Sequence, residues 1–248
     1  MRYVEKPNLP QSRVAVAAIS EAAGESIKKL NSLGIETVII KSSHFLPEPI
    51  NSHADIQLLH IGSNIIFSQK EHSFEGLEKK EFNIKYIKEY PNIKYPHDVR
   101  LNCAIIGDKI ICNKKTVSAN VLEFAESAGL TIINVNQGYS RCSICVVDEK
   151  SIITDDKSIF EAAQNFFDDT LYVSKNSIRL SGYNYGFIGG CTGKIDKNKI
   201  AFNGRIDSHE DHNKILDFMA DHNTVIIELN NERLTDIGGI IPLCEADD

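Results

Sequence analysis

Short apolar runs recur along the chain at a nearly constant interval, separated by polar loops. Each run is centred on two adjacent aliphatic residues: Ile65-Ile66, Ile110-Ile111, Ile152-Ile153 and, in a weaker copy, Ile200-Ala201. The first residues of successive pairs are 45, 42 and 48 positions apart. A period of this length is typical of stacked structural repeats, in which no copy closes a core alone. The chain is therefore expected to consist of several copies of one α/β unit.

The rest of the unit repeats on the same interval, as a helix-like stretch followed by another apolar strand. The copies are residues 27–33 with 37–40, 121–128 with 131–133, 160–167 with 171–173, 215–220 with 224–227, and a short, charged copy at 74–82 with 84–87. Five units of ββαβ type are predicted, but the last lacks its second hairpin strand. Residues 13–19 supply a spare strand at the N-terminus. Sharing a sheet between the two ends would leave no free edge, so we expect a five-bladed α/β propeller closed by the N-terminal strand.

An ordinary two-layer α/β domain is the alternative architecture, although such domains rarely repeat a hairpin at each step. In either case the length of 248 residues and the lack of a Pro- or Gly/Ser-rich linker predict one domain over residues 1–248. No apolar run is long enough to span a membrane, and the N-terminus has no signal-peptide core, so a cytoplasmic location is expected.

The charge and the cysteine content narrow the classes of partner. A net charge of -7 disfavours a broad nucleic-acid surface, which needs clustered Lys and Arg. Six cysteines in a chain without a secretion signal predict free thiols rather than disulfides. Cys142 and Cys145 have the spacing of a redox motif, but they are expected on a strand with their sulfurs on opposite faces. No cofactor and no metal site is predicted.

Polar residues occupy the first hairpin strand expected in each unit. These segments are residues 53–57, 96–100, 140–143, 184–187 and 235–238. Strand alternation would place His53, Asp55 and Gln57 on one face, and likewise Asp98 and Arg100. An apolar face is expected on the other side, so the polar faces would look toward the centre of the ring.

Stacking these strands puts Asp55, Asp98, Arg141 and Asp236 around a common axis. Carboxylates at close quarters repel each other unless a cation or water lies between them, so the arrangement suits a small cationic ligand. The alternative is an ionic plug, in which Arg100 and Arg141 neutralise the aspartates and hold the ring in register.

The repeat pattern resembles the pentein superfamily, the fold of guanidino-group-modifying enzymes. The segments most similar in style are residues 53–57, residues 129–141 and residues 236–244, which includes Gly238, Gly239 and Cys244. The resemblance to dimethylarginine hydrolases and deiminases implies a Cys nucleophile, a His general acid and carboxylates that hold a planar cation. It assigns these roles to Cys244 and to Asp55, Asp98 or Asp236.

The third unit departs from that pattern, because Ser140, Arg141 and Cys142 occupy the place where the family has a His. His53 or His97 would have to replace the missing acid. In the last unit, Cys244 also lies farther beyond the glycines than the family nucleophile.

Two classes of function stay open. One is a Cys-dependent hydrolase of C–N bonds in guanidino compounds. The other is a non-catalytic pentein used as a binding module, similar in size, acidity and repeat layout to translation initiation factor six.

Overall fold

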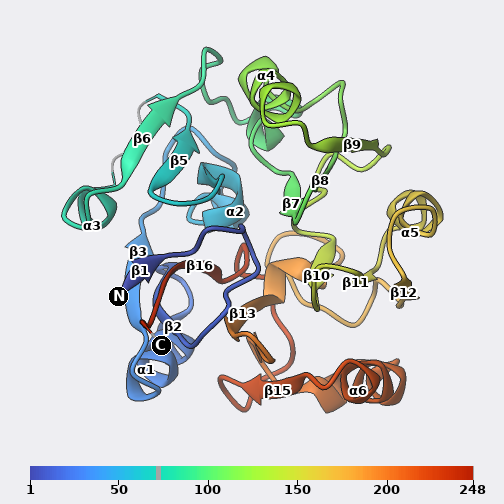
Figure 1. The fold of residues 1–248 in the computed structure, drawn as a ribbon. Helices are drawn as coiled ribbons and strands as arrows, with labels where there is room; N and C mark the ends of the chain where they lie inside the picture. Colours follow the sequence, from blue (N-terminus) through green and yellow to red (C-terminus); the bar gives the residue numbers. More distant parts are fainter. Residues whose placement is uncertain (71–73, 248) are drawn as a thin grey trace.

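The computed structural model describes residues 1–70 and 74–247, and Figure 1 shows five small sheets arranged around a common centre. Four of the sheets have three strands and one has four. This is an α/β arrangement of five repeated units, as the sequence predicts, and it differs from the alternative of a single two-layer sheet domain.

Each three-stranded sheet consists of an antiparallel hairpin and a third strand that pairs in parallel with the second. The strands are β4 (Leu58–His60), β5 (Ile65–Ser68) and β6 (Asn83–Tyr86); β7 (Ala104–Ile106), β8 (Lys109–Cys112) and β9 (Thr131–Asn134); β10 (Ile144–Val146), β11 (Ser151–Thr154) and β12 (Asp169–Tyr172); and β13 (Thr192–Asp196), β14 (Lys199–Phe202) and β15 (Val225–Glu228).

A helix on the outside of the molecule connects the second strand of each unit to the third (Figure 1). These helices are α1 (Gly24–Ser32), α3 (Glu75–Glu78), α4 (Ala119–Ser127), α5 (Lys157–Ala163) and α6 (His212–Asp221). Local caps fix two of their starts: the Ser118 hydroxyl accepts a hydrogen bond from Asn120 N, and the Asp156 carboxylate accepts from the Ser158 and Ile159 amides.

The two ends of the chain share the fifth sheet, whose strand order is β1-β16-β2-β3. Its strands are β1 (Arg2–Tyr3), β2 (Val14–Ser20), β3 (Glu36–Ile40) and β16 (Ile241–Glu245). β16 pairs antiparallel with β2, so the N-terminal strand supplies the partner that the last unit lacks.

The core lies between neighbouring units, because the buried clusters join residues of adjacent sheets; one of them joins Cys145 of β10 and Ile153 of β11 to the fourth unit. In the fourth unit, Ile200 and Phe202 of β14 contact Ile215 and Met219 of α6 in one buried cluster.

No helix in the described part of the chain is both long enough and apolar enough to cross a membrane.

The polar segments predicted as first hairpin strands are not strands. Residues 53–57 contain the short helix α2 (Ala54–Gln57), and residues 96–100 contain the 3-10 helix η2 (His97–Val99). Residues 140–143 form a turn, and segments 184–187 and 235–238 contain no named strand. The true first strands begin a few residues later, at the apolar runs. Over four residues, a tight turn and a strand show the same polar and apolar alternation, so the sequence pattern did not separate them.

Three further 3-10 helices complete the described elements: η1 (Glu48–Ile50), η3 (Gly189–Cys191) and η4 (Ile206–Ser208).

All four residues of α2 are buried. Strand alternation predicted that His53, Asp55 and Gln57 share one face, and this shared face does not exist. The turns before the hairpins, rather than the hairpins themselves, carry the polar residues toward the centre.

Candidate functional site

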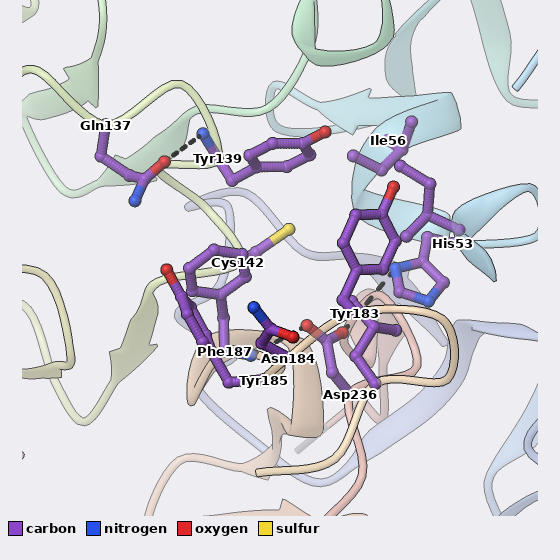
Figure 2. A pocket seen from close by; sticks show the side chains of 12 residues that line it. His53, Ile56, Gln137, Tyr139, Cys142, Tyr183, Asn184, Tyr185, Phe187 and Asp236 are labelled. Carbon is purple, nitrogen blue, oxygen red and sulfur yellow. Dashed lines mark hydrogen bonds and ion pairs between the residues drawn. The ribbon is translucent and has the colours of Figure 1, made fainter. Parts of the chain in front are cut away.

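A cavity of about 360 Å³ lies where the turns of several units converge (Figure 2). Small-molecule pockets generally fall in the range of about 300–1,000 Å³. Its lining residues are Ile50, His53, Ile56, Gln137, Tyr139, Cys142, Leu180, Tyr183, Asn184, Tyr185, Phe187 and Asp236. They come from the segments before β4, β10, β13 and β16, which are far apart in the sequence.

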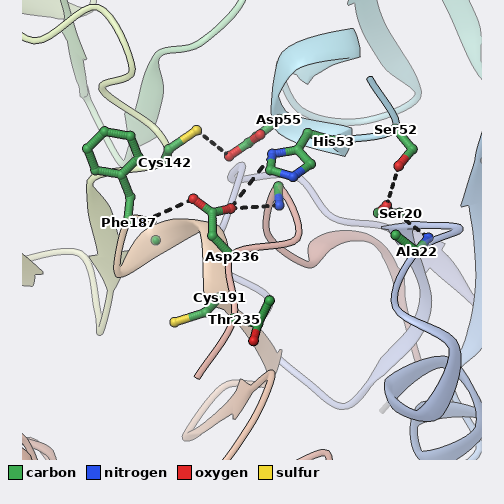
Figure 3. A network of polar contacts seen from close by, with 12 residues as sticks. Ser20, Ala22, Ser52, His53, Asp55, Cys142, Phe187, Cys191, Thr235 and Asp236 are labelled. Carbon is green, nitrogen blue, oxygen red and sulfur yellow. Dashed lines mark hydrogen bonds and ion pairs between the residues drawn. The ribbon is translucent and has the colours of Figure 1, made fainter. Parts of the chain in front are cut away.

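Asp236 provides the carboxylate of this pocket. Its two oxygens accept hydrogen bonds from the amides of Phe187 and Gly238, both at 3.0 Å, and His53 Nδ1 lies 3.7 Å from Oδ1 (Figure 3). The residue is 4% exposed, and burial raises the pKa of its carboxyl group above the ordinary value. Backbone donors hold the carboxylate in place while the proximity of His53 opposes the rise in pKa.

Two glycines make room for this arrangement. A Cβ at Gly190 would collide with the Asp236 carboxylate, and one at Gly238 would collide with the His53 side chain. Gly238 also has φ of +76°, which other residues rarely adopt. Gly238 of the last unit and Gly190 of the fourth unit thus allow His53 and Asp236 to approach each other.

Cys142 borders the same pocket, and its sulfur points into it (Figure 2). The thiol donates to Asp55 Oδ2 at 3.0 Å, and Asn102 Nδ2 donates to the sulfur at 3.1 Å (Figure 3 shows the contact with Asp55). Burial, followed by the negative charges of Asp55 and Asp236, raises the pKa of this thiol well above its ordinary value. In the free protein the sulfur is therefore held as the protonated, weakly nucleophilic thiol.

Aromatic rings form the wall of the pocket. Tyr139 and Phe187 are stacked with centroids 5.9 Å apart, and Tyr185 meets Phe187 edge to face at 5.7 Å. Tyr183 is 46% exposed and completes the wall. Faces of aromatic rings attract cations through their quadrupoles, so a carboxylate beside such a wall is a favourable site for an organic cation.

A second carboxylate lies behind the aromatic wall. The Tyr139 hydroxyl donates to Asp98 Oδ2 at 2.6 Å, and Asp98 is 3% exposed. Its other oxygen, Oδ1, is buried without a hydrogen-bond partner in the described structure. Burial raises the pKa of Asp98, although the Tyr139 hydrogen bond and the nearby His97 and Arg100 act in the opposite direction.

The arginines do not form the ionic plug that the sequence suggested. Arg141 is buried, but its guanidinium donates to Asn8 Oδ1 at 3.2 Å and to the carbonyls of Ile144 and Gly189. Arg100 Nη1 donates to the Thr116 carbonyl at 2.9 Å. The hydrogen bonds of both guanidinium groups go to neutral acceptors, and in the described structure neither group forms a salt bridge with Asp55, Asp98 or Asp236.

The other predicted site residues lie outside the pocket. Gln57 Nε2 donates to the carbonyls of Lys41 and Asn51, and His97 lies on η2. Cys244 lies in the middle of β16, opposite Tyr3 and Val16, and burial raises the pKa of its thiol to about 11. The structure therefore brings together His53, Asp55, Asp98 and Asp236 around the pocket, and does not bring Cys244 to them.

Sequence reasoning missed Cys142 and the aromatic wall. Cys142 follows Arg141 in a segment that was expected near the centre. This segment was predicted to be a strand, and Cys142 was not selected as a site residue. Tyr183, Tyr185 and Phe187 recur at every second position, and this pattern was a usable signal. Within residues 1–70 and 74–247, no group of three or more His, Cys, Asp or Glu side chains is placed to hold a metal ion.

Comparison with known proteins gives one family and one fold. Residues 18–241 match the model of a family of unknown function, DUF6873. No curated protein matches the sequence significantly.

Among solved structures, the inosamine-phosphate amidinotransferase of Streptomyces griseus is similar over 100% of this chain and 98% of its own, with a TM-score of 0.62 and 8% identity. Agmatine deiminase from C. jejuni matches 94% of both chains (TM-score 0.57, 11% identity). DDAH from Pseudomonas aeruginosa matches 87% of this chain and 92% of its own (TM-score 0.54, 6% identity). These proteins have the pentein fold, so they confirm the resemblance to that fold and its α/β class.

Proposed function

Because the chain belongs to DUF6873, a family of unknown function with the pentein fold in this member, we propose its function from the pocket: it binds a small organic cation of guanidinium or amidinium type. In this proposal the five units form a closed five-bladed propeller, and the ligand binds on the propeller axis beside Asp236.

The observation that carries this proposal is a buried carboxylate that faces an aromatic pocket and has no Lys or Arg partner in the described structure, only the imidazole of His53. Asp236 is fixed by two backbone amides, so its orientation is set before a ligand arrives. A planar cation would pair with this carboxylate and lie against the ring faces of Tyr185 and Phe187. A charge-assisted hydrogen bond contributes about 1.5–3 kcal/mol and a cation–π contact about 0.5–2 kcal/mol.

Binding, rather than hydrolysis, is the function that the free protein supports best. A nucleophilic thiol needs a lowered pKa, whereas the Cys142 pKa is raised and its proton is directed at Asp55. One observation keeps the hydrolase as a second candidate: the Cys142 sulfur borders the cavity that would hold the ligand. A bound cation would stabilise the thiolate, so turnover would use Cys142 and not Cys244.

Isothermal titration calorimetry with benzamidine, methylguanidine and agmatine tests the binding function. We expect at least one of them to bind, and Asp236→Asn to weaken that binding by about 30-fold or more because the charged acceptor is lost. Asp207→Asn is the matched control, since Asp207 is an exposed carboxylate on η4 that pairs with the preceding Arg205. Thermal melting checks that each variant folds.

Absence of binding by all three cations, or equal affinity in Asp236→Asn, would overturn the proposal. Mass spectrometry of the ligand after incubation separates the two candidates: an unchanged ligand supports a binding module, and a C–N cleavage product that Cys142→Ser abolishes supports the hydrolase.

A further inference from the structure

We propose that the pocket selects cations that carry no carboxylate, so that its ligand class is decarboxylated guanidino amines rather than the parent amino acids. This inference rests on the proposed function and adds the chemistry of the far end of the ligand. Three features of the pocket support it: the composition of its lining, the position of Asp98 and the existing interactions of the nearby basic groups.

The lining offers no permanent cation to an anionic group. None of the twelve residues that form the cavity is Lys or Arg. His53 is its one basic side chain, and this imidazole already lies against Asp236. A bound carboxylate would lose its water without gaining a charged partner, and burial of an unpaired charge is strongly unfavourable.

The basic residues near the pocket are already engaged. Lys175 lies over the Tyr185 ring, 5.9 Å from its centroid, but its ammonium pairs with Asp156 at 3.2 Å. Arg100 and Arg141 donate to the neutral acceptors described above. Recruiting any of them to a ligand carboxylate would break an existing interaction.

Asp98 makes the far end of the pocket favourable for a second positive charge. Figure 2 shows Tyr139 and Asp236 on opposite sides of the pocket, and the Tyr139 hydroxyl is bonded to Asp98. The negative charge of Asp98 also contributes, after burial, to the raised pKa of Tyr183 in the pocket wall. Its buried Oδ1 has no hydrogen-bond partner in the described structure, so the charge of Asp98 is not neutralised there and would attract an ammonium group bound near Tyr139.

The two carboxylates therefore match a ligand with a guanidinium at one end and an ammonium at the other. Agmatine, which is arginine without its carboxylate, has this charge pattern. Arginine would place an anion between Asp98 and Asp236, where like charges repel each other. Argininamide retains the rest of arginine while replacing the carboxylate with a neutral group.

Calorimetric titration of the intact protein with agmatine, argininamide and arginine measures this selectivity. We expect agmatine and argininamide to bind about 30-fold or more tightly than arginine. Arginine binding within threefold of agmatine, or more tightly, would overturn this inference while leaving the proposed function standing. If none of the three binds and the simpler cations also fail, the proposed function falls and this inference with it.

Two variants test the part assigned to Asp98. Asp98→Asn should reduce the preference for agmatine over arginine by about tenfold, because it removes the second negative charge, and Tyr139→Phe should retain most of the preference because Asp98 remains. Asp207→Asn is again the control. An unchanged agmatine-to-arginine ratio in Asp98→Asn, with a normal melting transition and retained benzamidine binding, would overturn the role of Asp98.

Discussion

Cys142 and Cys244 are both buried thiols with raised pKa values, yet they lie in different kinds of structure. Cys142 is in a turn before β10, within 3.0 Å of the Asp55 carboxylate and at the edge of the cavity. Cys244 is in β16, paired with β1 and β2 and packed among Val16, Val38 and other core residues. The first thiol packs against apolar residues such as Ile56 but is hydrogen-bonded to the polar side chains of Asp55 and Asn102, whereas the second lies in the apolar core of a sheet.

This difference separates two tasks within one repeated unit. The strands hold the five units together through paired backbones and apolar clusters. The turns that precede them direct side chains into the centre, where polar groups from distant segments meet. Changes near Cys244 are therefore expected to affect stability, and changes near Cys142 to affect ligand binding.

The largest effect that the comparison predicts is a loss of stability when Glu245 is substituted. Its buried carboxylate accepts hydrogen bonds from Arg2 Nε and from the amides of Gln11 and Ser12, and so links both ends of the chain. Glu245→Ala should lower the free energy of unfolding by about 1–3 kcal/mol, because three part-buried hydrogen bonds to this carboxylate are lost. Urea denaturation measures the loss, while benzamidine affinity should stay within twofold. A large loss of affinity in a folded variant would show that the two regions are coupled.

The next effect is the pH dependence of binding at Asp236. Burial raises the pKa of this carboxyl in the free protein, and a bound cation would lower it by stabilising the charged form. Binding then releases a proton, so affinity falls as the pH falls below the raised pKa, by up to about tenfold per unit.

Calorimetry between pH 5 and pH 8, in two buffers of different ionisation enthalpy, measures both the affinity and the proton release. Asp236→Asn should remove that part of the dependence. Affinity that rises toward low pH would contradict the role of Asp236 as the charged acceptor.

The sequence was sufficient to predict an α/β fold of five repeated units, but it predicted the site only in part. Hydrophobic periodicity located the repeated units and the N-terminal strand, because both follow from local pattern. It also indicated Asp55, Asp98 and Asp236 as central residues. It assigned their segments to strands, since a turn of four residues has the same alternation. The choice of Cys244 came from the resemblance to guanidino-group-modifying enzymes and not from periodicity. Whether a side chain reaches the centre depends on how turns from separate units converge, and this long-range geometry has no local pattern.

Thiol labelling gives the smallest effect and compares the two cysteines directly. Slow alkylation with iodoacetamide is expected at both sites, because both pKa values are raised and both residues are about 1–2% exposed. Asp55→Asn should speed labelling of Cys142 by about threefold or more, since it removes a negative charge that disfavours the thiolate. Labelling of Cys244 should not change in that variant, and benzamidine should protect Cys142 alone. Peptide mapping by mass spectrometry reads both sites in one sample, and equal protection of the two thiols would mean that the cation binds elsewhere or acts on overall stability.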